Sequence, residues 1–198
     1  MQKYINKLFN KKEESLLKSL IGQKLIKLRH DAYINSNVSF RKVSFFVEDK
    51  IYILSNLLEF MDFMWDNEDG YGDEDVAVFS FSECNEEATN EKYGFGDNLK
   101  IIDVPVNEII KDIIVIEDNV KAYDSKTKEF VSEYEYVKGV IFVFEGFKYC
   151  FSRGDWFIEH IDINKGVDPE SKLGDINEDW EWAEDRYSLN TRKFRSLK

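Results

Sequence analysis

The stretch Val43-Ser44-Phe45-Phe46-Val47-Glu48-Asp49-Lys50-Ile51-Tyr52-Ile53-Leu54 decides the fold. Two apolar runs rich in β-branched and aromatic residues flank a charged triplet, a pattern typical of a β-hairpin. The stretch 140–151 has the same pattern around Glu145-Gly146. We therefore expect antiparallel strands to dominate the middle of the chain.

The two hairpins match each other at a constant offset of 97 residues. Over the 18 ungapped positions that start at Val43, the identical pairs are Val43 with Val140, Phe45 with Phe142, Glu48 with Glu145, Tyr52 with Tyr149, Ser55 with Ser152 and Phe60 with Phe157. Self-similarity at a fixed offset indicates an internal duplication, although any two hairpins share the alternating pattern. We hypothesise a repeat, 43–62 with 140–159, inside a single domain 1–198, because no Pro-, Ser- or Gly-rich linker separates the halves.

Further strands are predicted wherever short runs of Val, Ile, Phe and Tyr alternate with charged turns. All predicted strands together are 24–29, 38–47, 50–55, 76–82, 99–104, 112–116, 130–137, 139–145, 147–152 and 156–163.

Helices are predicted only at the two ends of the chain. The first 22 residues space apolar side chains by three and four before Gly22, which predicts one or two short amphipathic helices. Asp175 or Asn177 can cap a short helix over 178–188, and the last ten residues read as a solvated tail. The expected fold class is α+β: a largely antiparallel sheet, two duplicated halves as a hypothesis, an N-terminal amphipathic helix and a short C-terminal helix.

Negative charge is concentrated in two windows. The 198 residues include 27 Lys+Arg and 39 Asp+Glu, a net charge of −12. Residues 62–97 hold twelve acids and one base, Lys92, and residues 174–185 hold six acids and no base, so the rest of the chain is net +5. Such a charge distribution repels nucleic acid and anionic membranes and favours a basic protein as partner.

Aromatic side chains lie among these acids. Trp and Tyr often anchor protein interfaces, and surrounding carboxylates steer a basic partner. We predict that the partner-binding residues are Trp65, Asp66, Glu68, Asp69, Tyr71, Asp73, Glu74 and Asp75, with Trp180 from the second window.

The run 66–75 was also compared with the calcium loop of EF-hands. Such a loop needs acids at its first, third and fifth positions and glycine at its sixth. With Gly70 at the sixth position Trp65 stands first, and with Gly72 there Tyr71 stands fifth, so both alignments fail. We predict no metal and no cofactor, and an irregular Ca²⁺ or Mg²⁺ site stays open as an alternative.

Few residues suit catalysis. His160 and Asp162 fall on one face of a predicted strand, where a surface ion pair is the commoner explanation. Cys84 follows Glu83 and has no base nearby in sequence to lower its pKa. No nucleophile-elbow, zinc-protease or paired-cysteine motif is present, so we expect the chain not to be an enzyme.

We expect a cytoplasmic protein. Cys84 and Cys150 read as two free thiols of a reducing compartment. Neither a signal peptide nor about 18 consecutive apolar residues occur.

In overall character the sequence resembles immunity proteins of bacterial polymorphic and contact-dependent toxin systems, which are small, acidic and rich in charged loops. This resemblance implies an α+β fold without a catalytic set that neutralises a basic toxin domain, often a nuclease, by direct binding. Two alternatives stay open: a duplicated-sheet regulatory or small-ligand-binding domain and, less favoured, a metal-dependent hydrolase. The oligomeric state stays unknown at this stage.

Overall fold

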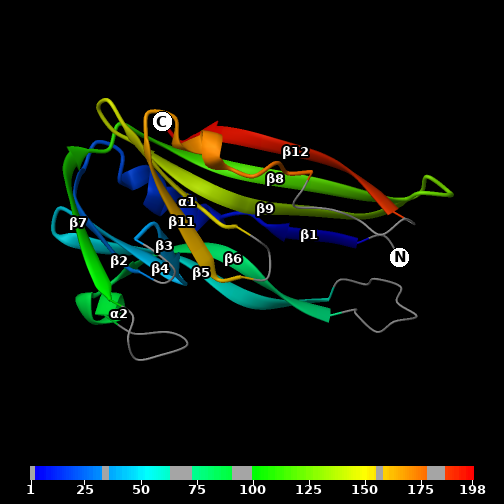
Figure 1. The fold of residues 1–198 in the computed structure, drawn as a ribbon, viewed down its shortest axis with the longest axis horizontal. Helices are drawn as coiled ribbons and strands as arrows, with labels where there is room; N and C mark the ends of the chain where they lie inside the picture. The colour runs from blue at the N-terminus through cyan, green and yellow to red at the C-terminus, as the bar shows by residue number, and fades with distance from the viewer. Residues whose placement is uncertain (1–2, 33–35, 63–72, 91–99, 155–157, 178–185) are drawn as a thin grey trace.

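The computed structural model describes residues 3–32, 36–62, 73–90, 100–154, 158–177 and 186–198. Strands make up 64% of the structure and helical turns 11%. The strands form two sheets, and two short α-helices and one 3-10 turn accompany them in the described ranges (Figure 1). The predicted α+β class is therefore wrong: the protein is mostly β.

The first sheet has five antiparallel strands in the order β6-β5-β4-β2-β7. Its strands are β2 (Lys24–Asp31), β4 (Lys42–Val47), β5 (Lys50–Asp62), β6 (Asp73–Cys84) and β7 (Ile101–Ile109). Helix α2 (Glu86–Asn90) lies in the connection from β6 to β7.

The second sheet has seven strands in the order β12-β8-β9-β10-β11-β3, and β1 pairs in parallel with β9. Its strands are β1 (Lys3–Lys7), β3 (Val38–Phe40), β8 (Asp112–Asp124), β9 (Phe130–Val143), β10 (Lys148–Ser152), β11 (His160–Gly166) and β12 (Arg186–Ser196). The 3-10 turn η1 (Pro169–Lys172) lies between β11 and β12.

Both sheets contain the same chain path. Four neighbouring strands form a meander, β2-β4-β5-β6 in one sheet and β8-β9-β10-β11 in the other, and a fifth strand returns to pair with the first. In the first meander the chain passes through β3 of the other sheet between β2 and β4. The central hairpins share a register, since Phe45 lies opposite Tyr52 and Phe142 opposite Tyr149. The duplication stays a prediction, and this common path supports it.

The main core lies between the two sheets. Phe45 and Phe142, which are equivalent under the offset of 97, stack with their ring centroids 4.7 Å apart. Leu17 and Leu20, in and just after helix α1 (Lys11–Ser19), are fully buried in the same cluster. Stacked aromatic pairs contribute about 0.5–1.5 kcal/mol beyond their buried area. The hairpin 43–54 thus packs against the matching hairpin 140–151 in the core between the two sheets.

Buried polar groups follow the repeat as well. The backbone N–H of Asn56 donates to the carbonyl of Arg41 (2.8 Å), and that of Arg153 donates to the carbonyl of Lys138 (3.0 Å), at positions again 97 apart. The Asn56 amide also donates to the carbonyl of His160, whereas the Arg153 guanidinium donates to the carbonyl of Ala77. Each half therefore places a buried donor against the fourth meander strand of the other half.

The N-terminal prediction of an amphipathic helix is wrong for residues 3–7, which form strand β1. Helix α1 begins only at Lys11 because Asn10 caps it: its side chain accepts from the N–H of Glu13 (3.1 Å), and the Glu13 carboxylate accepts from the N–H of Asn10 (2.8 Å). The chain before this cap is extended, and its exposure alternates residue by residue.

The C-terminal end is also a strand, so the predicted solvated tail is wrong. β12 pairs with β8 along its whole length, from Arg186 to Ser196, and Leu197 beyond it is buried. Of the predicted helix 178–188, residues from 186 onward are strand, and 178–185 lie outside the described residues.

Candidate protein-binding face

The predicted partner-binding residues are only partly described. Outside the described residues lie Trp65, Asp66, Glu68, Asp69, Tyr71 and Trp180. The backbones of Asp73 and Glu74 begin strand β6, and Asp75 follows them with an exposed side chain. The structure therefore places one predicted side chain, that of Asp75, at the surface, opposite Phe60 of β5.

Strands β5 and β6 continue beyond the rest of their sheet. Strand β4 pairs with β5 only as far as Ser55, whereas β6 accompanies β5 to Asp62. We call the two-stranded extension formed by 56–62 and 73–79 the β5–β6 arm. Beyond the end of β4 it runs alongside β1 and β9 of the second sheet (Figure 1), and its strands flank residues 63–72, where most of the predicted loop lies.

Large apolar side chains are exposed on this arm. The exposed fractions are 67% for Phe60, 41% for Leu57 and 39% for Leu58. The Glu159 carboxylate accepts from the N–H of Leu58 at 3.1 Å, which brings this segment beside the arm. Ile158, the residue before Glu159, is also exposed. Leu58 and Phe60 lie on one face of β5 and Leu57 lies on the other, because successive side chains of a strand point to opposite faces.

The base of the arm is tied to the second sheet. Val76 and Val78 are buried against Tyr134 and Tyr136 of β9, and Glu59 forms an ion pair with Lys7 of β1. One face of the arm is therefore packed on the second sheet, and Leu58 and Phe60 lie on its other face.

Side chains cover part of the outer edge of β6. The carbonyl of Ala77 accepts from Arg153, and the N–H of Phe81 donates to the Glu13 carboxylate at 3.1 Å. Such cover blocks strand addition at these two positions.

Ion pairs neutralise several acids of the 62–97 window. Glu83 pairs with Lys50 at 3.3 Å, and Glu86 pairs with Arg29 at 3.7 Å. Asp75 is exposed and has no ion pair within the described ranges.

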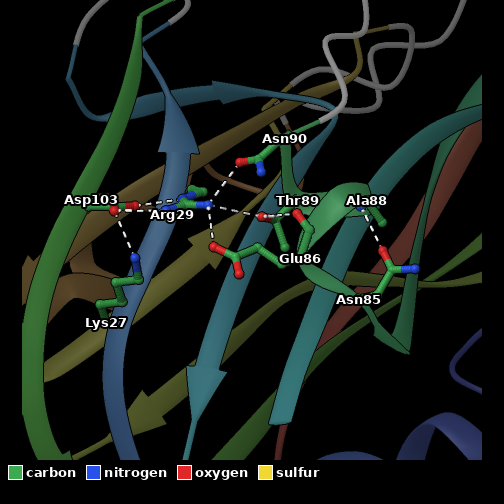
Figure 2. Close-up of polar contacts among 8 residues, drawn as sticks. All are labelled: Lys27, Arg29, Asn85, Glu86, Ala88, Thr89, Asn90 and Asp103. Atoms are coloured by element: carbon green, nitrogen blue, oxygen red, sulfur yellow. Dashed lines mark hydrogen bonds and ion pairs between the residues drawn. The ribbon is translucent and has the colours of Figure 1, made fainter. Parts of the chain in front are cut away.

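A network of charged and polar side chains fixes α2 to the first sheet (Figure 2). The Arg29 guanidinium donates to Asp103 from Nε (2.7 Å) and Nη2 (2.9 Å), and through Nη1 to Asn90 (2.8 Å). Lys27 Nζ also donates to Asp103 at 2.7 Å. The hydrogen bond from Arg29, helped by Lys27, holds the pKa of Asp103 well below its usual range. These groups satisfy one another, so we assign the network a structural role.

The catalytic candidates are poorly placed for nucleophilic chemistry. Burial raises the pKa of Cys84 to about 11 and that of Cys150 to about 12, so both thiols are protonated at neutral pH. His160 packs edge-on against Phe40, with centroids 6.2 Å apart. Among the described residues, no three His, Cys, Asp or Glu side chains form a group that could hold a metal ion.

Comparison with protein-family models, with curated proteins and with solved structures finds no match to this chain. None of the helices in the described part of the chain has the length and apolar character needed to cross a membrane.

Proposed function

We propose that this chain is a protein-binding module of the immunity type, which docks a basic partner through the β5–β6 arm. The observation that carries the proposal is the exposure of Leu58 and Phe60 on one face of an arm whose strands flank the predicted acidic loop. Apolar anchors beside carboxylates suit an interface in which burial supplies affinity and charge supplies orientation.

Charge determines which kind of partner fits. The twelve acids and single base of residues 62–97 attract a basic surface and repel a second copy of the same window. Asp75, directly opposite Phe60, places one such charge beside the exposed ring. A basic protein is therefore the occupant we assign to the arm, rather than a second copy of this chain.

The resemblance to immunity proteins supports a specific role, the neutralisation of a basic toxin domain by direct binding. If the role holds, the neighbouring upstream reading frame encodes a large secreted protein with a toxin domain at its carboxyl end. That domain is the partner to be tested.

The test is calorimetric titration of the full chain with the carboxyl-terminal domain encoded by the upstream reading frame. We expect binding that Phe60→Ser weakens about tenfold or more, as expected for an aromatic anchor. The matched control is Phe194→Ser, since Phe194 is an equally large ring, 50% exposed on β12 and away from the arm. Cells that co-express the toxin domain should grow with the wild-type chain and with Phe194→Ser, and should grow less well with Phe60→Ser.

Two results would overturn the proposal. One is the absence of binding between the wild-type chain and that domain. The other is binding that Phe60→Ser and Phe194→Ser weaken equally.

A further inference from the structure

A cavity of about 240 Å³ opens between the two sheets, away from the β5–β6 arm. Its apolar walls are Leu28 of β2, Val104 of β7 and Ile163 of β11. These side chains come from both sheets, so the cavity lies between them.

The polar side chains around this cavity are cationic or neutral. They are His30, Ser36, Asn37, Tyr149, Asn164, Lys165 and Lys172. No Asp or Glu is among the described residues that line it, although the chain has 39 acids against 27 bases. Two lysines beside this cavity create a local positive potential in an acidic protein.

Two polar side chains that line the cavity, His30 and Tyr149, can form further hydrogen bonds with a ligand. His30 is 4% exposed, and its Nδ1 lies 2.7 Å from the carbonyl oxygen of Asp31. Because a carbonyl only accepts, Nδ1 is the donor, and Nε2 has no partner within the described ranges. The hydroxyl of Tyr149, a residue 4% exposed, likewise makes no hydrogen bond to any described residue.

The two lysines have no carboxylate partner in the described part of the chain. Lys165 Nζ lies 4.5 Å from the centroid of Phe147 and 5.2 Å from that of Tyr149. Such cation–π contacts hold an ammonium group over a wall of the cavity without neutralising its charge.

We propose that this cavity binds a small oxyanion of the phosphate class, inorganic phosphate or a small phosphate monoester. Lys165 and Lys172 supply the charge, and the Tyr149 hydroxyl donates a hydrogen bond from within the fold. His30 Nε2, the acceptor nitrogen of the tautomer whose Nδ1 donates, accepts from a protonated phosphate oxygen. A volume of 240 Å³ equals about eight water volumes of roughly 30 Å³, which suits an ion with a few waters. It lies below the roughly 300–1,000 Å³ typical of pockets for larger organic ligands. The proposal does not depend on the partner-binding role.

The test is the melting temperature and calorimetric titration of the full chain with sodium phosphate, against sodium chloride at equal ionic strength. Phosphate should raise the melting temperature, because a ligand that binds only the folded state stabilises it. The double variant Lys165→Gln/Lys172→Gln should weaken phosphate binding about tenfold or more, through the loss of both charges. Lys193→Gln should bind like wild type, since Lys193 is an exposed lysine outside the cavity.

Tyr149→Phe tests the interior of the cavity, because it keeps the buried ring and removes only the hydroxyl. It should weaken phosphate binding while leaving the melting temperature of the free protein nearly unchanged. Titration with glycerol 3-phosphate in place of inorganic phosphate distinguishes a phosphate monoester from the free ion. The compound that binds more tightly indicates which of the two the cavity takes. The proposal is overturned if phosphate acts no better than chloride, if acetate binds as well as phosphate, or if the double variant and Lys193→Gln bind equally.

Discussion

The Asp118 side chain is fully buried, and the Arg192 guanidinium meets it with Nε and Nη2 at 2.7 and 2.8 Å. The Tyr136 hydroxyl donates to the same carboxylate at 3.1 Å. This ion pair joins β12 to β8. It therefore holds in the sheet a segment for which the sequence predicts a solvated tail.

Replacing Asp118 by Asn should destabilise the fold by about 3–5 kcal/mol, because it leaves the Arg192 charge without this carboxylate in a buried place. Urea unfolding measures the change. Lys121→Gln is the control: the Lys121–Glu133 pair is partly exposed, at 43% and 21%, and exposed pairs contribute at most about 1 kcal/mol. A loss below about 1 kcal/mol for Asp118→Asn would contradict the role given to this ion pair.

Asp103 gives the fold a pH dependence. Its pKa is depressed in the folded protein, chiefly by the hydrogen bond from Arg29, so its contribution is complete above the unfolded value of about 3.9. The contribution is lost as the pH falls from that value towards the depressed folded pKa. Asp103→Asn should therefore be less stable than wild type at pH 7, by about 0.5–1 kcal/mol after allowing for solvent screening.

The difference between the two proteins should shrink below about pH 4, where the wild-type carboxylate of the unfolded chain is protonated. Thermal unfolding from pH 2 to 7 measures it. A difference that stays constant over that range would show that the ion pair does not act through the charge of Asp103.

At the scale of elements, the central hairpins could be predicted because their alternation of apolar and polar residues is local. The predicted strand 38–47, however, breaks at Arg41, whose φ is +68°, and its pieces join different sheets as β3 and β4. Strand β1 was missed because its five residues merge in sequence with the periodic pattern of α1. The exposure of Phe60 could not be predicted either, since it depends on where β4 ends beside β5.

Gly139 of β9 shows how closely the second hairpin is packed. A Cβ at this position would lie 2.6 Å from the carbonyl oxygen of Phe151 and 3.1 Å from the Cα of Ser152. Both atoms belong to the backbone of β10, which must move to make room. Gly139→Ala should therefore destabilise the protein by about 1–3 kcal/mol.

Gly166→Ala is the matched control, because the nearest atom to its Cβ is 3.9 Å away, at an ordinary contact distance. Chemical denaturation of the two variants compares them directly. Equal stability of Gly139→Ala and wild type would mean that β9 and β10 lie farther apart than described here.

At the scale of the whole molecule, two features of the sequence organise the structure. The repeat at an offset of 97 corresponds to two sheets with a common chain path, each contributing a phenylalanine to the central stack. Among the described residues, the acidic window 62–97 contains β6, the second strand of the arm, and α2, whereas the exposed Leu58 and Phe60 lie just before it in β5. The sequence could therefore predict the region of the candidate site but not its apolar part, because the exposed fraction of a side chain depends on tertiary neighbours.

The central claim is that the β5–β6 arm receives a basic partner, and hydrogen exchange of the chain with and without the upstream-encoded domain tests it most directly. We predict that bound partner slows exchange at the amides of 57–60 and 75–78 by about tenfold or more and leaves β12 unchanged. Protection confined to β12 or β7, with none on the arm, would contradict the account.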